Sequence, residues 1–199
     1  MAKRETTRPI QWIGHAGQID TLSSPIRQDI VDTVDALGTC SVAELAQVLG
    51  RPADGLYYHV KALQRAHLLA VSAAIRDGRR ETRLSVESRQ FIRYKPAHAT
   101  HRAAVLRVVS AMLRNARRHF ARGFHDEGAV VEGAYRNLWA ARTRGGLSRQ
   151  RLREVNRLLH ALLESFEPPQ PAGSRSDLYE LTFVLAPAHA RRGRARLRS

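Results

Sequence analysis

One segment, residues 49–69, constrains the fold of this 199-residue chain more than any other. Its sequence, LGRPADGLYYHVKALQRAHLL, places Leu56, Val60 and Leu63 at helical spacing. That spacing predicts the buried stripe of one helix. A different face of the same helix carries a polar, aromatic and cationic set: Asp54, Tyr58 and Lys61. We therefore expect a helix that packs on one side and stays exposed on the other.

Two shorter patterns before this segment predict two more helices. The first begins where Ser24 precedes Pro25, and its apolar residues recur every three or four positions until Gly38 ends the run. The second begins at Ser41, and Glu44 three residues later completes the spacing of a capping box. The chain therefore contains three successive helices joined by short turns.

A β-hairpin is expected directly after the third helix. The strand-like runs VSAAI and ETRLSV flank a charged turn that contains Asp77 and Gly78, a strong hairpin signal. The tip and the return strand carry four arginines: Arg76, Arg79, Arg80 and Arg83. Two interpretations of these arginines stay open, a contact with a phosphate backbone or an ordinary solvated loop.

Three capped helices followed by a basic hairpin form a winged helix-turn-helix, and residues 22–86 resemble the winged-helix transcriptional regulators of the ArsR-like superfamily. The segments that carry the resemblance are SSPIRQDIVD, SVAELAQVLG and GLYYHVKALQRAHLL. The resemblance implies that the start of the third helix reads bases in the major groove of double-stranded DNA and that the wing contacts the DNA backbone. It assigns DNA binding to these residues: Ala53, Asp54, Gly55, Tyr57, Tyr58, Lys61, Arg79 and Arg80.

Two of these positions carry a qualification. Members of the family often have a small hydroxyl residue where Tyr57 stands, which changes how deeply the helix can enter the groove. Asp54 carries a charge that opposes phosphate, so a role as an N-terminal cap or as a partner of the helix dipole competes with base reading.

The charge balance agrees with a polyanionic partner. The chain has 33 Lys and Arg against 18 Asp and Glu, a formal net charge of +15. Arginine outnumbers lysine, which fits phosphate and guanine contacts but equally fits a genome of high G+C content. The alternative function is therefore a non-specific architectural or RNA-binding basic protein.

The remaining composition predicts the location and limits the chemistry. The chain has no apolar run long enough to span a bilayer and no signal-peptide pattern at its start, so we expect a cytoplasmic protein without a membrane partner. The single cysteine, Cys40, cannot form an internal disulfide and is expected to be structural.

Catalytic and metal-site patterns are not found. The sequence lacks a phosphate-binding P-loop, a Gly-x-Ser-x-Gly elbow and a His-Glu-x-x-His motif. Asp126 and Glu127 form the adjacent acidic pair, in a glycine-flanked stretch ill suited to hydrolysis. His98 with His101, or His119 with His125, offer only loose metal-ligand sets. We predict no enzyme activity, no cofactor and no metal site, with a metal-assisted hydrolase as the least favoured function.

The second half of the chain predicts a smaller helix-strand-helix-strand domain, which makes the whole chain α+β. The helices are expected at residues 100–122 and from Ser148 onward, and the strands at residues 134–144 and 178–187. The expected organisation is an N-terminal extension (1–21), a winged helix DNA-binding domain (22–90), a linker (91–99), a C-terminal dimerisation or accessory domain (100–187) and a disordered basic tail (188–199). The tail either attracts DNA or only improves solubility.

Two roles are open for the second half. The helix at residues 100–122 carries an apolar stripe expected to form a homodimer interface, unless it packs internally: Val105, Val109, Met112 and Leu113. Four aromatic residues could line a cavity for an unidentified small-molecule effector, or simply fill a core: Tyr135, Trp139, Tyr179 and Phe183.

Overall fold

A computed structural model of the protein describes residues 9–76, 78–166 and 177–188. These residues form two compact units: residues 9–122 with 177–180, and residues 123–166 with 181–188. The turn residue Asp77, residues 167–176 and nearly all of the basic tail lie outside the described residues.

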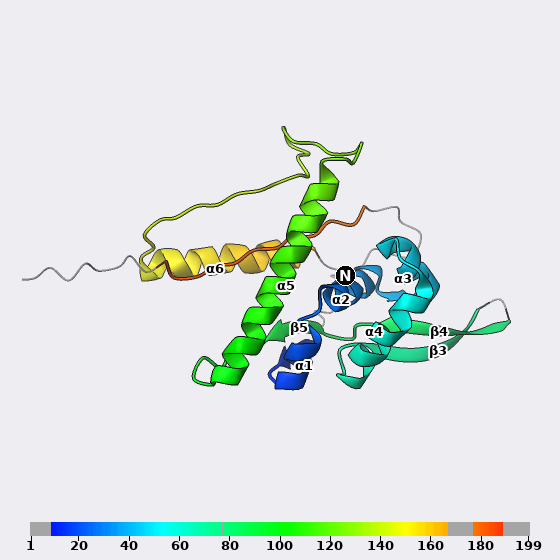
Figure 1. Ribbon diagram of the computed structural model, residues 1–199. Helices are drawn as coiled ribbons and strands as arrows, with labels where there is room; N and C mark the ends of the chain where they lie inside the picture. Colours follow the sequence, from blue (N-terminus) through cyan, green and yellow to red (C-terminus); the bar gives the residue numbers. More distant parts are fainter. Residues whose placement is uncertain (1–8, 77, 167–176, 189–199) are drawn as a thin grey trace, which may run out of the picture. The chain divides into compact units, whose positions relative to one another are not determined.

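Three helices of the first unit match the predicted ones (Figure 1). They are α2 (Pro25–Leu37), α3 (Val42–Leu49) and α4 (Ala53–Arg65). Pro25 occupies the first turn of α2, and Gly38 follows its end at a positive φ of 74°, a conformation that glycine adopts without strain. The capping box of α3 is present in full, because Ser41 and Glu44 each bond the other's backbone N–H.

The predicted hairpin is formed by β3 (Ala70–Arg76) and β4 (Arg79–Ser85), which pair antiparallel. A two-residue strand, β2 (Thr39–Cys40), adds to the other edge of β4, so the strand order is β2-β4-β3. Cys40 is buried there, and burial raises the pKa of its thiol to about 11. A buried, protonated thiol is unreactive, consistent with the structural role expected for this residue.

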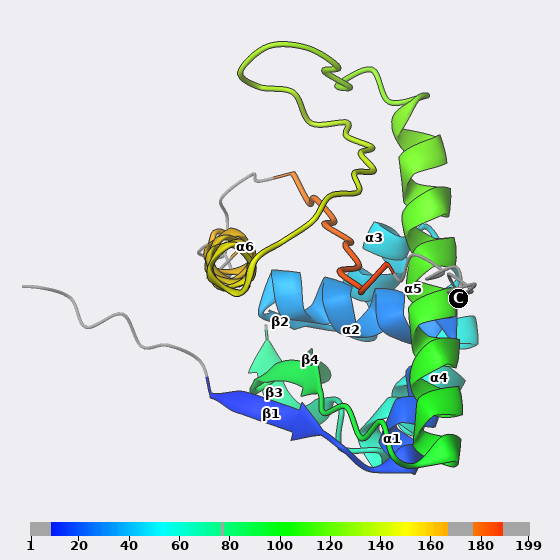
Figure 2. The same ribbon diagram turned by 90° about the vertical axis from the view of Figure 1, so that its left-hand side faces the viewer.

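The N-terminal segment is part of the fold as well. It contains β1 (Ile10–Ile13), which pairs parallel with β5 (Arg89–Ile92), and the short helix α1 (Ala16–Thr21) (Figure 2). Ile13 and Ile19 are buried in the core of the first unit. A four-residue strand and a six-residue helix are too short to show a periodic pattern, which explains why the sequence indicated only an extension.

Helix α5 (Ala99–Gly123) also packs into the first unit, against α2. Val105 and Val108 are buried in the core. Asn115 Nδ2 donates to the Pro25 carbonyl oxygen (2.9 Å), and Arg118 donates to Asp29 (2.6 Å). Burial raises the pKa of Asp29 despite this arginine. The helix predicted to open the C-terminal region thus contributes one face to the core of the first unit.

The second unit departs from its prediction. Its described regular element is α6 (Arg149–Glu164), capped by Ser148. The strands predicted at residues 134–144 and 178–187 are wrong, because both segments are irregular in the structure. A strand needs a partner for its backbone groups, and Asn137 instead bonds the nearby loop, accepting from Val130 N and donating to the Gly128 carbonyl oxygen. Of the described helices, none is long and apolar enough to cross a membrane.

Candidate nucleic-acid interface

The two faces of α4 are separated as the sequence predicts. Leu56, Val60 and Leu63 are buried against the core. On the remaining surface of the helix, Tyr57, Tyr58 and Lys61 are exposed. Because the buried stripe fixes the rotation of the helix, these three side chains face solvent in the folded protein.

The first turn of α4 holds three of the predicted site residues. Ala53 is half-buried, and its side chain packs against the core. A ligand at this position would therefore contact mainly the backbone of Ala53. Asp54 and Gly55 are exposed. The N-cap of the helix is Pro52 and no side chain caps it, so the capping interpretation of Asp54 is wrong. Asp54 remains in the first turn, where its charge stabilises the helix dipole.

A cation of α2 and two aromatic rings of α4 lie side by side on this surface. The Arg27 guanidinium lies 5.9 Å from the centre of the Tyr58 ring, and the Tyr58 and His59 rings are 5.4 Å apart in an edge-on arrangement. Arg27 also donates to the Thr21 carbonyl oxygen (3.4 Å). These contacts restrict the orientation of Tyr58 although its ring is exposed. Sequence reasoning missed Arg27, because nothing local in α2 indicates that it lies beside α4.

The surroundings of His59 are electropositive. Burial lowers the pKa of His59, and the nearby guanidinium groups of Arg27 and Arg51 lower it further. The ring is therefore neutral at pH 7, and in the described part of the chain its buried Nδ1 has no hydrogen-bond partner. Two cations around a neutral histidine favour a phosphate group at this edge of α4.

The arginines of the hairpin do not all have the same role. Arg80 is exposed on β4, while the side chains of Arg76 and Arg79 lie outside what the structure describes. Arg83 is occupied inside the protein, and its side chain is only 17% exposed. Its guanidinium donates to Glu44 Oε2 (2.8 Å), to the Thr39 carbonyl oxygen (2.8 Å) and to Glu81 Oε2 (3.3 Å). These bonds favour a structural role for Arg83, which ties β4 to α3 and β2.

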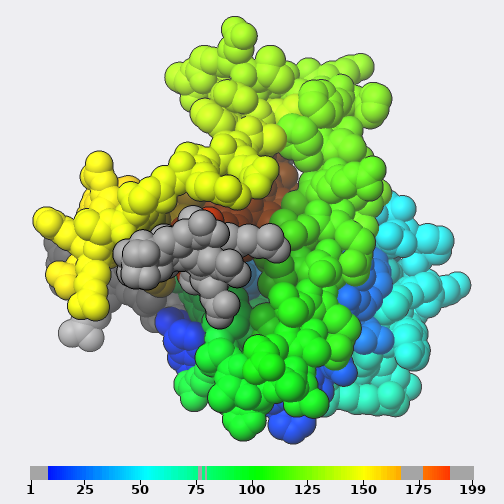
Figure 3. All heavy atoms as spheres, turned by 60° about the vertical axis from the view of Figure 1, so that its left-hand side comes forward, coloured from blue at the N-terminus to red at the C-terminus, as the bar shows by residue number. Residues whose placement is uncertain are grey.

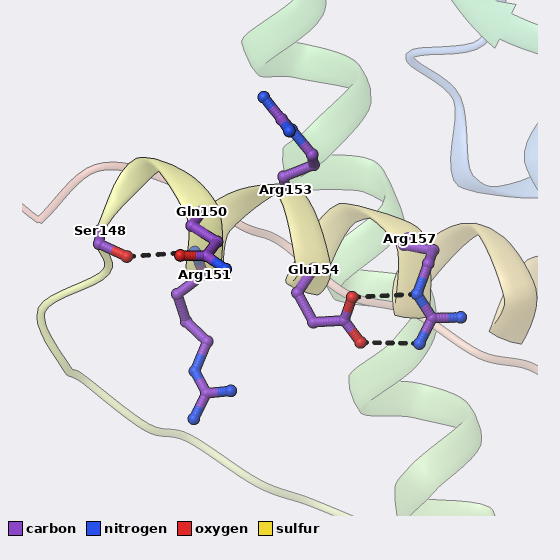
Figure 4. Close-up of a pocket in the computed structure, with 6 residues that line it drawn as sticks. All are labelled: Ser148, Gln150, Arg151, Arg153, Glu154 and Arg157. Atoms are coloured by element: carbon purple, nitrogen blue, oxygen red, sulfur yellow. Dashed lines mark hydrogen bonds and ion pairs between the residues drawn. The ribbon is translucent and has the colours of Figure 1, made fainter.

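Other candidate sites receive less support from the geometry. No group of three or more His, Cys, Asp or Glu side chains within the described residues is placed to hold a metal ion. The aromatic residues considered for an effector cavity are all exposed: Tyr135, Trp139, Tyr179 and Phe183. A surface hollow at the start of α6 is lined by hydrophilic residues, including Arg151, Glu154 and Arg157 (Figure 4).

Comparison with known families agrees with the geometry of the first unit. Residues 22–72, which span α2, α3, α4 and the start of β3, match the family model of a helix-turn-helix domain. This part of the chain is therefore a helix-turn-helix domain, and that supports a DNA-binding regulator. No curated protein matches the chain.

Proposed function

We propose that the protein is a sequence-specific DNA-binding transcriptional regulator of the ArsR-like type, without enzymatic activity and acting in the cytoplasm. The observation that carries this proposal is the exposed face of α4, with Tyr57, Tyr58 and Lys61, on the third helix of the helix-turn-helix domain. Tyrosine and lysine side chains at that position reach base edges and phosphates when the helix lies in the major groove of double-stranded DNA.

Each part of the proposed interface has a separate role. Tyr57, Tyr58 and Lys61 read the groove, and Ala53 and Gly55 let the backbone of the first turn approach it. The β3–β4 hairpin acts as a wing, with Arg79 and Arg80 on the phosphate backbone. Asp54 stabilises the start of the helix through its interaction with the helix dipole.

The protein acts as a homodimer in this proposal, because one winged helix covers too few base pairs to be specific and two half-sites require a two-fold partner. Val105 of the stripe first expected at the interface is buried in the core of its own chain, whereas Leu106 and Leu113 of α5 are exposed. A small-molecule effector would act by binding the DNA-competent and DNA-incompetent dimers with different affinities.

The second candidate is a non-specific architectural or RNA-binding protein, which the net charge of +15 favours. The two functions differ in what the aromatic face of α4 does. A protein that contacts only the nucleic-acid backbone needs only cationic side chains. Loss of an α4 tyrosine would therefore weaken its binding to all sequences equally.

The deciding experiment compares two exposed tyrosines. An operator is first selected from a random DNA pool, and affinities for operator and random DNA are then measured at several salt concentrations. Tyr58, 70% exposed on α4, is changed to alanine, and Tyr94, 68% exposed and outside α4, is the matched control. Tyr58→Ala should lower operator affinity by about 1–3 kcal/mol and leave random-DNA affinity nearly unchanged, whereas Tyr94→Ala should affect neither. Equal losses on both DNAs for Tyr58→Ala would favour the non-specific function.

A further inference from the structure

The neighbours of Arg27 on α2 show which way its side chain is directed. Gln28 donates to a backbone carbonyl oxygen of α5 (3.1 Å) and Asp29 accepts from Arg118 of α5 (2.6 Å), so both of these side chains face α5. Arg27 instead lies beside α4, with its guanidinium carbon 5.9 Å from the centre of the Tyr58 ring. Figure 3 shows blue atoms of the N-terminal helices adjoining cyan atoms of α3 and α4, in agreement with the packing of α2 on both. The first unit therefore holds an arginine of α2 against the proposed base-reading helix.

The Arg27 guanidinium has few hydrogen-bond acceptors around it. Arginine presents several N–H groups in a planar fork. Within the described residues this one makes a single hydrogen bond, 3.4 Å long, to the Thr21 carbonyl oxygen, and its buried Nε has no partner there. One turn further along α2 lie Ile30 and Val31, so the helix offers no carboxylate at ion-pair spacing. An anion that accepts two N–H bonds at once would supply the missing acceptor.

A second guanidinium belongs to the same cluster. Arg51 is exposed in the turn between α3 and α4, and its backbone N–H donates to a carbonyl oxygen of α3 (3.0 Å). Burial lowers the pKa of His59, and the positive charges of Arg27 and Arg51 lower it further, so both guanidinium groups act on this ring. The ring is uncharged at pH 7, and its buried Nδ1 has no hydrogen-bond partner among the described residues. The cluster thus combines two cations with polar atoms that lack acceptors or donors.

The surface of α4 beside this cluster is open. Gly55 and His59 are four residues apart, which places them on one side of the helix. A Cβ added at Gly55 would meet nothing within 4 Å. The nearest acidic residue of α4, Asp54, is exposed on the first turn, where water and salt screen its charge. An anion that approaches along Gly55 therefore has access to the cluster.

We propose that Arg27, Arg51 and His59 bind one phosphate of the DNA backbone, and we call these three residues the phosphate clamp. The inference rests on the proposed function and adds to it a contact outside the predicted recognition residues. The two guanidinium groups hold the phosphate oxygens, and an N–H of the His59 ring donates a further hydrogen bond. Because Arg27 also contacts the Tyr58 ring, the bound phosphate restrains the tyrosine that reads the groove. Arg27 is thus a positioning residue for Tyr58.

The DNA backbone is the favoured source of this phosphate, because the clamp adjoins the exposed face of α4. A helix that lies in the major groove has a phosphate backbone along each of its sides. Such a contact carries no sequence information, but it fixes the position in which Tyr58 and Lys61 meet the base edges. A free phosphate ion offers the same chemistry, so the two sources need separate measurements.

The first experiment neutralises one phosphate at a time. The selected operator is made with a single uncharged methylphosphonate in place of each phosphate in turn, and affinities are measured for the unchanged chain and for Arg27→Ala. One position in each half-site should cost the unchanged chain about tenfold in affinity and lose its effect in Arg27→Ala. Arg51→Ala should abolish the effect at that same position. Independent effects of Arg27→Ala and every methylphosphonate overturn the proposal, and so does a different phosphate for Arg51→Ala.

The matched control is Arg102 of α5, another arginine that donates to a backbone carbonyl oxygen, that of Pro96. Arg102→Ala removes the same charge from the chain but should leave the cost of every methylphosphonate unchanged. Loss of the same position in Arg102→Ala would show only an effect of net charge and overturn the clamp. If thermal unfolding shows that Arg27→Ala does not fold, Arg27→Gln removes the charge and keeps a polar side chain, with the same expected result.

A double-variant comparison tests the link to Tyr58. Arg27→Ala and Tyr58→Ala should each lower operator affinity, and the double variant should lose less than the product of the two losses, because both changes affect the same restrained tyrosine. Arg102→Ala combined with Tyr58→Ala should lose no more than Tyr58→Ala alone. Fully multiplicative losses for the Arg27 and Tyr58 pair would overturn the positioning role of Arg27.

Inorganic phosphate alone tests for a free-anion site. It is titrated into the DNA-free chain at constant ionic strength while the unfolding temperature is followed. The unchanged chain and Arg27→Ala should respond equally. A saturable rise of the unfolding temperature that Arg27→Ala abolishes would assign the cluster to a free anion and overturn the DNA contact.

Failure of the clamp can be told apart from failure of the proposed function. Operator preference that depends on Tyr58, without any methylphosphonate coupled to Arg27, removes the clamp and leaves the sequence-specific function standing. If no DNA sequence is preferred, the sequence-specific function fails, and the clamp is then judged on random DNA. There Arg27→Ala should reduce the slope of log affinity against log salt by about 1, and Arg102→Ala should not. Equal slopes for these two variants would overturn the clamp as well.

Discussion

Neighbouring arginines on one strand can have opposite functions, and β4 provides an example. Arg80 is exposed, whereas Arg83 makes three hydrogen bonds inside the protein. The sequence places both on a basic hairpin and gives no sign of the difference. The distinction depends on Glu44 and Thr39, which are distant in sequence and reach Arg83 only through the pairing of β2 with β4.

The two arginines should therefore respond differently to the same substitution. Arg83→Ala should lower the free energy of unfolding by about 1–2 kcal/mol, since it breaks charged hydrogen bonds to a carboxylate that is itself partly exposed. Arg80→Ala should leave the free energy of unfolding unchanged, but weaken binding to all DNA and reduce the slope of log affinity against log salt by about 1. Urea denaturation and salt-titrated binding measure the two effects. An unaltered unfolding midpoint in Arg83→Ala would contradict the structural role.

At the scale of elements, prediction succeeds where the signals are contiguous. The helices α2, α3 and α4 can be predicted from apolar spacing within a dozen residues, aided by Pro25 at the start of α2 and by the capping box of α3. The hairpin can be predicted from its Asp-Gly turn. Elements defined by distant partners are missed or wrongly assigned: β1 and β2 exist because β5 and β4 pair with them. The segment at residues 178–187 has strand-like residues but is irregular. A composition rich in β-forming residues does not by itself provide a neighbouring strand to pair with.

Helix α5 illustrates this limit. Its amphipathic pattern predicts that one face is buried, but the pattern does not identify the element against which that face packs. Val108 faces the core and Leu106 is exposed on the same helix. We predict that Val108→Ala lowers the free energy of unfolding by about 1–3 kcal/mol, through lost burial and a residual cavity. Leu106→Ala should change it by less than about 0.5 kcal/mol. Both are measured by chemical denaturation monitored by circular dichroism, and equal effects would contradict the assigned orientation of α5.

At the scale of the whole molecule, the boundary between units lies later than the sequence indicates. Proline and the loss of helical period at residues 91–99 suggested a linker, yet the chain returns to the first unit through α5. The exposed face of α4 could be predicted, because its buried residues recur at helical spacing within the helix itself. Arg27 and Arg51, which surround His59, could not, because helix packing brings them there.

The position of that boundary leads to a prediction for truncated chains. A chain that ends at residue 122 keeps α5 and should unfold cooperatively, whereas one that ends at residue 98 loses Val105 and Val108 from the core together with the Asn115 bond to Pro25. Burial of each valine contributes about 1.5–3 kcal/mol, so the loss is comparable with the total stability of about 5–15 kcal/mol expected for a small domain.

The shorter chain should therefore show no cooperative thermal transition by circular dichroism. The longer chain, which keeps the first unit, should fold and still prefer a half-site of the operator over random DNA. Its matched control is the same truncation with Tyr58→Ala, which should fold equally well and lose that preference, because Tyr58 is exposed and supports no core contact. If the chain ending at residue 98 unfolds at the same temperature as the one ending at 122, then α5 belongs to the second half of the molecule and the first unit is complete without it.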